Sequence, residues 1–329
     1  MAVNLKGRSF LTLMDFSADE ITYLLDVAKD LKIKKRMGLT GEMLKDKSIL
    51  LLFEKTSTRT RFAFEIGASE EGAHVTFLAP DVSQFGNKES LEDSAKIFGR
   101  FYDGIEYRGY DQRVVEDLAK YSGVPVWNGL TDVDHPTQIL ADLMTIEEHL
   151  PNRALNSIKV VFCGDTRNNM SYAWMYGCAK MGMKFVAYGP EELAPDKEIL
   201  AKVEEISERS GAHISFSSSD DCLKDADVIY TDVWASMGEE DKIPQRVKLL
   251  TPYKVTMDML KKTGNPNILF MHCLPAFHDL ETKVAAEQMA KGYDIREVED
   301  EVFRSRHSVV FDEAENRMHT IKAVIVTTL

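Results

Sequence analysis

Cysteine is scarce in this sequence, and long apolar runs are missing from it. The four cysteines are widely spaced and include no CxxC pair, which predicts neither a disulfide framework nor a metal site. No apolar stretch approaches the ~20 residues that a membrane-spanning helix needs. The first residues show no charged leader followed by an apolar stretch and a cleavage site. Together these absences favour a cytoplasmic protein.

Positive charge is also in short supply. The 40 lysines and arginines are outnumbered by 53 aspartates and glutamates, which gives a formal net charge of −13. Most of the surface should therefore repel nucleic acids and anionic lipids, so we predict neither as a partner. An anionic substrate must be caught by a local cluster of arginines or by backbone N–H groups.

Length and periodicity predict two α/β domains. A chain of 329 residues exceeds the ~150 residues that one domain typically holds. Short apolar runs alternate with helical patterns through both halves, which predicts two doubly wound parallel sheets with a cleft between them. We place the domains at 1–150 and 151–305 and a C-terminal helix within 306–329. The predicted strands are Ser48–Phe53, Val75–Leu78, Val124–Trp127, Ile158–Phe162, Lys184–Tyr188, His213–Phe216, Val228–Tyr230 and Ile268–His272.

A polar segment from Glu54 to Arg61 follows the first predicted strand, where a helix begins. Ligands collect at the carboxyl ends of parallel strands, next to unpaired backbone N–H groups, so we interpret this segment as a phosphate cradle. An ordinary helix cap is the alternative, because Ser and Thr favour that position. The segment is not a Walker loop, and no GxGxxG turn occurs after the second-half strand at 158–162, so neither nucleotide hydrolysis nor NAD binding is predicted.

Two motifs of the first half resemble the aspartate and ornithine carbamoyltransferase family. They are the run Ser57-Thr58-Arg59-Thr60-Arg61 and the helix start His135-Pro136-Thr137-Gln138. A histidine N–H and a glutamine amide can match the acceptor and the donor of a carbamoyl group, although a structural histidine is the alternative. The resemblance implies that carbamoyl phosphate is bound by Ser57, Thr58, Arg59, Thr60, Arg108, His135, Pro136, Thr137 and Gln138.

The polar loop Ser83–Ser90 reads by itself as solvent-exposed surface. In the family the corresponding loop reaches into the active site of the adjacent subunit. The resemblance therefore implies that Gln84 contacts carbamoyl phosphate. It also implies a homo-oligomer, a trimer or an assembly of trimers.

Three segments of the second half resemble the ornithine branch of the same family: Gly164–Met170, Asp232–Gly238 and Met271–Pro275. An amino-acid substrate carries an α-ammonium and an α-carboxylate, so its site needs an acidic partner and neutral donors. A core methionine and a turn glycine are the alternative for the middle segment. The resemblance implies that ornithine is bound by Asn169, Asp232, Ser236 and Met237.

Cys273 and Leu274 lie in the third of these segments, and the resemblance also places them at carbamoyl phosphate. A buried structural thiol is the alternative. Transfer needs a neutral δ-amine, although a free one has a pKa of ~10.4, so a thiol or carboxylate that orients it and handles its proton is useful. We assign that role to Cys273 with Asp232 as a hypothesis.

The segment Glu313–Thr320 resembles a further element of the family, although a solvated helix face is the bland alternative. Periodicity does not say where this helix docks. The resemblance implies that Arg317 reaches the carbamoyl group, which requires the helix to fold back onto the first domain. One departure from the family is the bulky run Ser171–Tyr176.

The resemblance as a whole implies transfer of a carbamoyl group from carbamoyl phosphate to the δ-amine of ornithine, without a metal or organic cofactor. Arg59, Arg108, His135, Gln138, Asp232 and Cys273 are the predicted catalytic residues, with His135 and Arg59 stabilising the oxyanion. Putrescine, aspartate or an acetylated amino acid is the alternative acceptor, and a catalytically silent paralogue is the alternative class of protein. The direction, arginine biosynthesis or citrulline breakdown, stays open.

Overall fold

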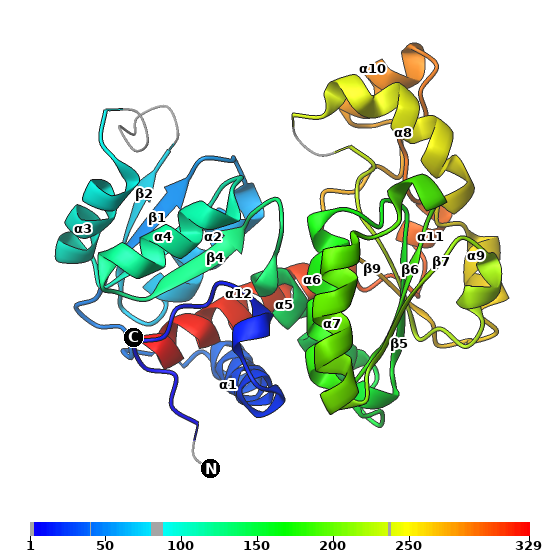
Figure 1. The fold of residues 1–329 in the computed structure, drawn as a ribbon. Coiled ribbons are helices and arrows are strands. Elements are labelled where there is room, and N and C mark those ends of the chain that lie inside the picture. Colours follow the sequence, from blue (N-terminus) through cyan, green and yellow to red (C-terminus); the bar gives the residue numbers. More distant parts are fainter. Residues whose placement is uncertain (1–2, 40, 80–87, 236–237) are drawn as a thin grey trace. The chain divides into compact units, whose positions relative to one another are not determined.

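The computed structural model describes residues 3–39, 41–79, 88–235 and 238–329 (Figure 1). The chain divides into two compact units. Unit 1 consists of Met1–Met144 with Ala314–Leu329, and unit 2 is Thr145–Glu313. Within the described ranges, every helix is too short or too polar to cross a membrane.

A four-stranded parallel sheet forms the centre of unit 1, with the strand order β2-β1-β3-β4. Its strands are β1 (Ser48–Phe53), β2 (His74–Leu78), β3 (Gly104–Arg108) and β4 (Val126–Leu130). Five of the six residues of β1 are buried, as its unbroken apolar run predicted. The helices that contribute to this unit are α1 (Ala18–Arg36), α2 (Thr58–Ser69), α3 (Leu91–Phe101), α4 (Gln112–Ser122), the first part of α5 (Pro136–His149) and most of α12 (Val310–Thr328).

Strand β3 is the element of this sheet that the sequence did not reveal. It carries Glu106 and Arg108, which break up the apolar pattern expected of a buried strand. All five of its residues are nevertheless buried, because β3 lies between β1 and β4 in the sheet. The two charges thus lie inside the fold beside the end of β1.

A five-stranded parallel sheet forms the centre of unit 2, with the order β7-β6-β5-β8-β9. Its strands are β5 (Lys159–Cys163), β6 (Lys184–Tyr188), β7 (His213–Ser217), β8 (Val228–Thr231) and β9 (Leu269–His272). All five were predicted. The helices are α6 (Asn169–Met181), α7 (Lys197–Ser210), α8 (Ile243–Leu250), α9 (Met257–Lys262), α10 (Lys283–Ala290) and α11 (Asp300–Phe303). The prediction of two doubly wound parallel sheets is confirmed.

The strand order reverses once in each sheet. In unit 1 the chain moves from β1 to β2 on one side and then crosses to β3, and in unit 2 it moves from β5 to β6 and later crosses to β8. Doubly wound sheets bind ligands at this reversal, outside the carboxyl ends of the two strands that flank it. The segments after β1 and β3, and those after β5 and β8, are therefore where the candidate site residues belong.

Most of the C-terminal helix α12 belongs to unit 1. Its attachment is polar as well as apolar. Lys32 Nζ donates to Asn316 Oδ1 at 2.6 Å in the interior, and Trp127 Nε1 donates to Thr328 Oγ1 at 3.0 Å. These bonds hold both ends of the returning segment against the first unit.

The bulky run in α6 packs into a regular helix. Trp174 meets Tyr230 edge to face with ring centroids 5.3 Å apart, and Tyr172 donates its hydroxyl to Asp196 Oδ2 at 2.8 Å. Both side chains are buried. The departure from the family pattern therefore fills the space beside β8 without interrupting α6.

Candidate active site

The helix start at α2 is both a cap and a candidate anion site. Ser57 is the N-cap residue, and its Oγ accepts the backbone N–H of Thr60 at 3.3 Å. The remaining N–H groups of a first helical turn have no partner within the helix and point along its axis. Ser57 and Arg59 are half-buried and Thr58 is exposed. The helix-cap reading of the sequence is therefore correct, and it leaves the anion-binding reading intact.

Two arginines converge on the hydroxyl of Thr60. Arg108 Nη1 donates to Thr60 Oγ1 at 3.1 Å, and Arg317 Nη2 donates to the same oxygen at 2.8 Å. Arg108 is 8% exposed and Arg317 is 4% exposed. Two buried cations this close repel each other, so the cluster gains stability when an anion binds beside it.

His135 shares the space of these cations. It is 3% exposed, and burial lowers the pKa of its imidazole well below the ordinary value, helped by the positive charges of Arg317 and Arg108. The ring is therefore neutral at physiological pH and can donate one hydrogen bond to a carbonyl oxygen. Thr137 Oγ1 lies 3.4 Å from its Nδ1.

Gln138 is oriented by a neighbour on the next turn of α5. Its Nε2 donates to Asp142 Oδ1 at 2.8 Å, and both residues are buried. Since the amide nitrogen faces Asp142, the carboxamide oxygen is the atom suited to accept an N–H from a substrate. Pro136 and Thr137 complete this buried helix start.

Glu106 is a buried carboxyl that the sequence interpretation overlooked. Burial raises the pKa of Glu106 well above its usual range, against the lowering effect of Arg108 and Arg317. Among the described residues, neither carboxyl oxygen has a hydrogen-bond partner. The sequence carried no signal for it, because its strand, β3, was not predicted.

In unit 2, Asp232 follows β8 and gathers three donors. Its Oδ1 accepts the Val233 N–H at 2.8 Å and the Cys273 thiol at 3.3 Å, and its Oδ2 accepts Asn168 Nδ2 at 3.4 Å. The structure thus brings together the aspartate and the cysteine that the sequence interpretation paired. Adjacency of β8 and β9 in the sheet explains the meeting, because Cys273 directly follows β9.

Asn168 and Asn169 begin helix α6. Asn168 is the N-cap residue, with its Oδ1 accepting the Ser171 N–H at 2.8 Å. Asn169, predicted to bind ornithine, is the first residue of the helix and is half-buried. The contact of Asn168 with Asp232 was missed, because the sequence motif emphasised only the second asparagine.

The turn at Cys273 and Leu274 is held by two buried residues. His272 Nδ1 accepts the Leu274 N–H at 2.9 Å, and its Nε2 donates to Glu297 Oε1 at 3.1 Å. Glu297 Oε1 also accepts the Phe277 N–H at 2.7 Å. Leu274 has φ of 56° and precedes a cis proline. Because a side chain at positive φ is strained, these bonds are needed to keep the turn in place.

Asp232, His272 and Cys273 each offer one atom that could bind a metal ion. These three atoms lie within 4.8 Å of one another, close enough to bind the same ion. Both ring nitrogens of His272 are already engaged, however, by Leu274 and Glu297. A metal ion would have to displace one of these bonds.

Three predicted site residues, Gln84, Ser236 and Met237, lie outside the described residues. The others fall into two half-sites. The unit 1 half-site contains Ser57, Thr58, Arg59, Thr60, Arg108, His135, Pro136, Thr137, Gln138 and Arg317. The unit 2 half-site contains Asn169, Asp232, Cys273 and Leu274.

Two family models match nearly the whole chain. The model described as "Aspartate/ornithine carbamoyltransferase, carbamoyl-P binding domain" matches residues 8–148, and "Aspartate/ornithine carbamoyltransferase, Asp/Orn binding domain" matches residues 156–328. The first match contains every residue of the unit 1 half-site except Arg317. The second contains the half-site of Asp232 and Cys273, together with helix α12.

Relatives and solved structures resemble the chain along its full length. A Clostridium perfringens protein named "Ornithine carbamoyltransferase, catabolic" is 68% identical, with 100% of this chain and 99% of the relative covered. A Limosilactobacillus reuteri protein named "Ornithine carbamoyltransferase" is 56% identical with the same coverage. The structure of ornithine carbamoyltransferase from Pyrococcus furiosus has a TM-score of 0.90 at 39% identity, covering 99% of this chain and 98% of that one.

Proposed function

Because the chain belongs to the aspartate/ornithine carbamoyltransferase family, we infer that it transfers the carbamoyl group of carbamoyl phosphate to the δ-amine of L-ornithine, giving L-citrulline and phosphate. The observation that carries this inference is the convergence of Arg108 and Arg317 on Thr60 beside the neutral ring of His135. The negative charge of carbamoyl phosphate offsets the two cations, and its carbonyl oxygen accepts from the imidazole.

In unit 1 we propose that the phosphate lies at the start of α2, against Ser57 to Thr60, with Arg59 and Arg108 as its cations. The carbamoyl end then faces His135, Gln138 and Arg317. The His135 N–H binds the carbonyl oxygen, which becomes an oxyanion when the amine attacks. Donors that are already oriented need no rearrangement in the transition state, so they stabilise it more than water does.

In unit 2 we propose that ornithine is bound by Asn169, Asp232, Ser236 and Met237. The δ-nitrogen must be neutral to attack, so the ammonium form has to lose a proton. The Cys273 thiol and the Asp232 carboxylate, joined by a hydrogen bond of 3.3 Å, orient the amine and take part in moving that proton. The new C–N bond forms first, giving the tetrahedral oxyanion, and collapse of that oxyanion breaks the C–O bond and releases phosphate.

A comparison of acceptors tests the assignment. The purified protein should make citrulline from carbamoyl phosphate and ornithine. Its kcat/KM for ornithine should be higher than its kcat/KM for putrescine or for aspartate. A higher kcat/KM with putrescine would sink ornithine as the acceptor. If no acceptor is carbamoylated while carbamoyl phosphate still binds, the chain is a silent paralogue.

We propose that the enzyme works in the direction of citrulline breakdown. The support is that a 68% identical relative from Clostridium perfringens is named a catabolic ornithine carbamoyltransferase. Deleting the gene should stop cells from consuming citrulline without making them require arginine. A requirement for arginine in the deletion strain would show that biosynthesis is the working direction.

We also propose a cytoplasmic homo-oligomer, a trimer or an assembly of trimers, with Gln84 reaching a neighbouring subunit. Sedimentation should show multiples of three subunits. Mixed oligomers of two inactive variants, Gln84→Ala and His135→Ala, should recover part of the activity if the sites are shared. A fully active monomer would overturn this proposal, and cell fractionation tests the compartment.

A further inference from the structure

A cavity of about 480 Å³ lies in unit 2, apart from the residues of the proposed ornithine half-site. It is lined by residues 149–153, 266–269 and 306–307. These segments include the amino end of β9, whereas Cys273 follows its carboxyl end. The volume is in the range of about 300 to 1,000 Å³ that is usual for sites of small organic ligands.

The polar lining of this cavity consists of cations and hydrogen-bond donors. It includes Arg153, Arg306, His149, His307, Asn152 and Asn267, and no aspartate or glutamate is among the described residues that line it. Such a lining is unusual in a chain with a formal net charge of −13. It favours a ligand that carries negative charge.

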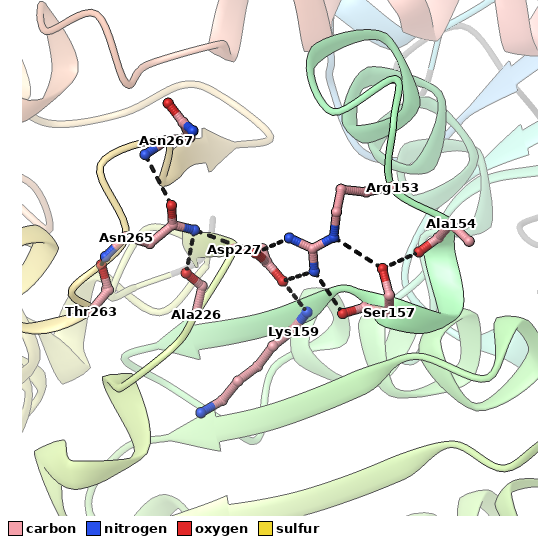
Figure 2. A network of polar contacts seen from close by, with 9 residues as sticks. All are labelled: Arg153, Ala154, Ser157, Lys159, Ala226, Asp227, Thr263, Asn265 and Asn267. Atoms are coloured by element: carbon pink, nitrogen blue, oxygen red, sulfur yellow. Dashed lines mark hydrogen bonds and ion pairs between the residues drawn. The ribbon is translucent and has the colours of Figure 1, made fainter.

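Arg153 lines the cavity and is held in place by its hydrogen bonds. Its Nη1 and Nη2 donate to the two carboxylate oxygens of Asp227 at 3.0 and 3.1 Å (Figure 2). The same aspartate accepts the Lys159 N–H at 2.9 Å and is 5% exposed. Because Asp227 offsets the charge of Arg153, this guanidinium shapes the cavity more than it charges it.

Asn265 connects the same network to the opposite lining segment. Its Nδ2 donates to Asp227 Oδ1 at 3.3 Å, and its Oδ1 accepts the Asn267 N–H at 2.9 Å (Figure 2). The backbone that presents Asn267 to the cavity is thereby fixed in place. The site is thus organised before any ligand binds.

Arg306 supplies the uncompensated charge. It is exposed, and among the described residues no carboxylate pairs with it, whereas Arg304 pairs with Asp300 at 2.8 Å and with Asp279 at 3.3 Å.

His307 is half-buried, and its Nδ1 donates to the Ile268 carbonyl at 2.9 Å, which orients the ring and leaves Nε2 as its other polar atom. An acidic side chain next to the lining, Asp312, has its Oδ2 2.9 Å from His149 Nε2.

We propose that this cavity binds a small phosphate-bearing anion, with Arg306 as its cation and the side-chain amide of Asn267 as a neutral donor. An arginine beside a neutral donor is suited to the tetrahedral oxygens of phosphate. Inorganic phosphate and a phosphate ester share this chemistry. The volume leaves room for the organic part of an ester.

Histidine ring signals in NMR spectra of the full-length protein can test the proposal. The eight histidines can be assigned by His→Gln substitution. Titration with ribose 5-phosphate, and separately with inorganic phosphate, should shift the signals of His149 and His307 saturably. His135 lies in the unit 1 half-site, away from the cavity. Its signal therefore reports phosphate binding at the proposed carbamoyl phosphate site. The two probes show which source of phosphate the cavity accepts.

Arg306→Gln should weaken binding at the cavity roughly tenfold or more, since a charged hydrogen bond is lost. Its matched control is Arg304→Gln, which removes the same charge two residues away, from a side chain that does not line the cavity. The response of His135 should be the same in both variants. The proposal is overturned if the signals of His149 and His307 respond to neither probe, or if both variants weaken binding equally. The acceptor comparison tests the proposed function independently.

Discussion

Arg317 donates a hydrogen bond to the hydroxyl of Thr60 at 2.8 Å, although 257 positions separate the two residues in the chain. Arg108 donates to the same oxygen at 3.1 Å. Thr60 is fully buried, so its side chain anchors both guanidiniums instead of facing solvent. The last helix thereby contributes directly to the half-site at the start of α2.

Arg317→Gln should reduce kcat/KM for carbamoyl phosphate by roughly tenfold to a hundredfold, because a charged hydrogen bond to the substrate is lost. Steady-state kinetics at saturating ornithine measures this. The control is Arg36→Gln. It removes an exposed arginine of α1 whose Nη2 lies 3.6 Å from Oε1 of Glu315, a residue of the same helix as Arg317. Equal losses in the two variants would contradict the assigned role of Arg317.

The pKa of His135 should rise in Arg317→Gln. Burial is the main cause of its lowered pKa, and the charge of Arg317 is the next. The wild-type ring should therefore stay neutral below pH ~6.5, where a free histidine takes up a proton. An NMR titration of the ring follows the change, with Arg36→Gln as the control. An unchanged pKa would show that the two groups do not interact.

The free energy of unfolding of Glu106→Gln, measured relative to that of the wild type, should increase as the pH rises. The folded state keeps this carboxyl protonated, whereas the unfolded state releases the proton above pH ~4.3. The folded state then binds more protons, so wild-type stability falls with pH by up to about 1.4 kcal/mol per unit until Glu106 ionises. Urea unfolding at pH 5 and pH 8 measures the difference. The prediction is contradicted if the variant and the wild type differ in unfolding free energy by the same amount at pH 5 and at pH 8.

Loss of the bond between His272 and Leu274 should affect ornithine more than carbamoyl phosphate. In His272→Ala the Leu274 N–H loses its acceptor, and the strained turn beside Cys273 relaxes. We expect a rise of roughly tenfold in the KM for ornithine, with the Kd of carbamoyl phosphate in the free enzyme within about twofold of wild type.

A pair of substitutions at Glu297 separates this positioning role from general destabilisation. Glu297→Gln keeps an oxygen that can accept from His272 and from the Phe277 N–H, so most of the ornithine affinity should return. Glu297→Ala should behave like His272→Ala. If Glu297→Gln is as impaired as Glu297→Ala, the hydrogen bonds do not position the turn.

Some site residues could be predicted because their signals are local. A buried apolar strand followed by hydroxyls and arginines identified Ser57 to Thr60, and helix-start patterns identified His135 and Asn169. Each signal spans only a few neighbouring residues and coincides with a strand end or a helix start in the structure, although the binding role of Asn169 was implied by the family resemblance alone. The pairing of Cys273 with Asp232, assigned by resemblance, is also seen as a hydrogen bond.

The overlooked residues depend on contacts between distant segments. Glu106 looked unsuited to a buried strand, and Glu297 lies outside every motif. Asn168 was passed over for its neighbour, although it reaches Asp232. Asn168 and Glu297 meet partners from distant segments, and Glu106 is buried by the strands on either side of β3, which no pattern along the chain records.

The sequence by itself determined the alternation of strands and helices, the places where polar side chains follow strand ends, and the family. These follow from side-chain periodicity and short motifs, which are properties of neighbouring residues. Only the tertiary structure decided that β3 is a central strand, that Arg317 and Arg108 share Thr60, and that His272 and Glu297 hold the turn at Leu274. The physical reason is that sheet order and helix docking are set by burial and hydrogen bonding between segments far apart in the chain.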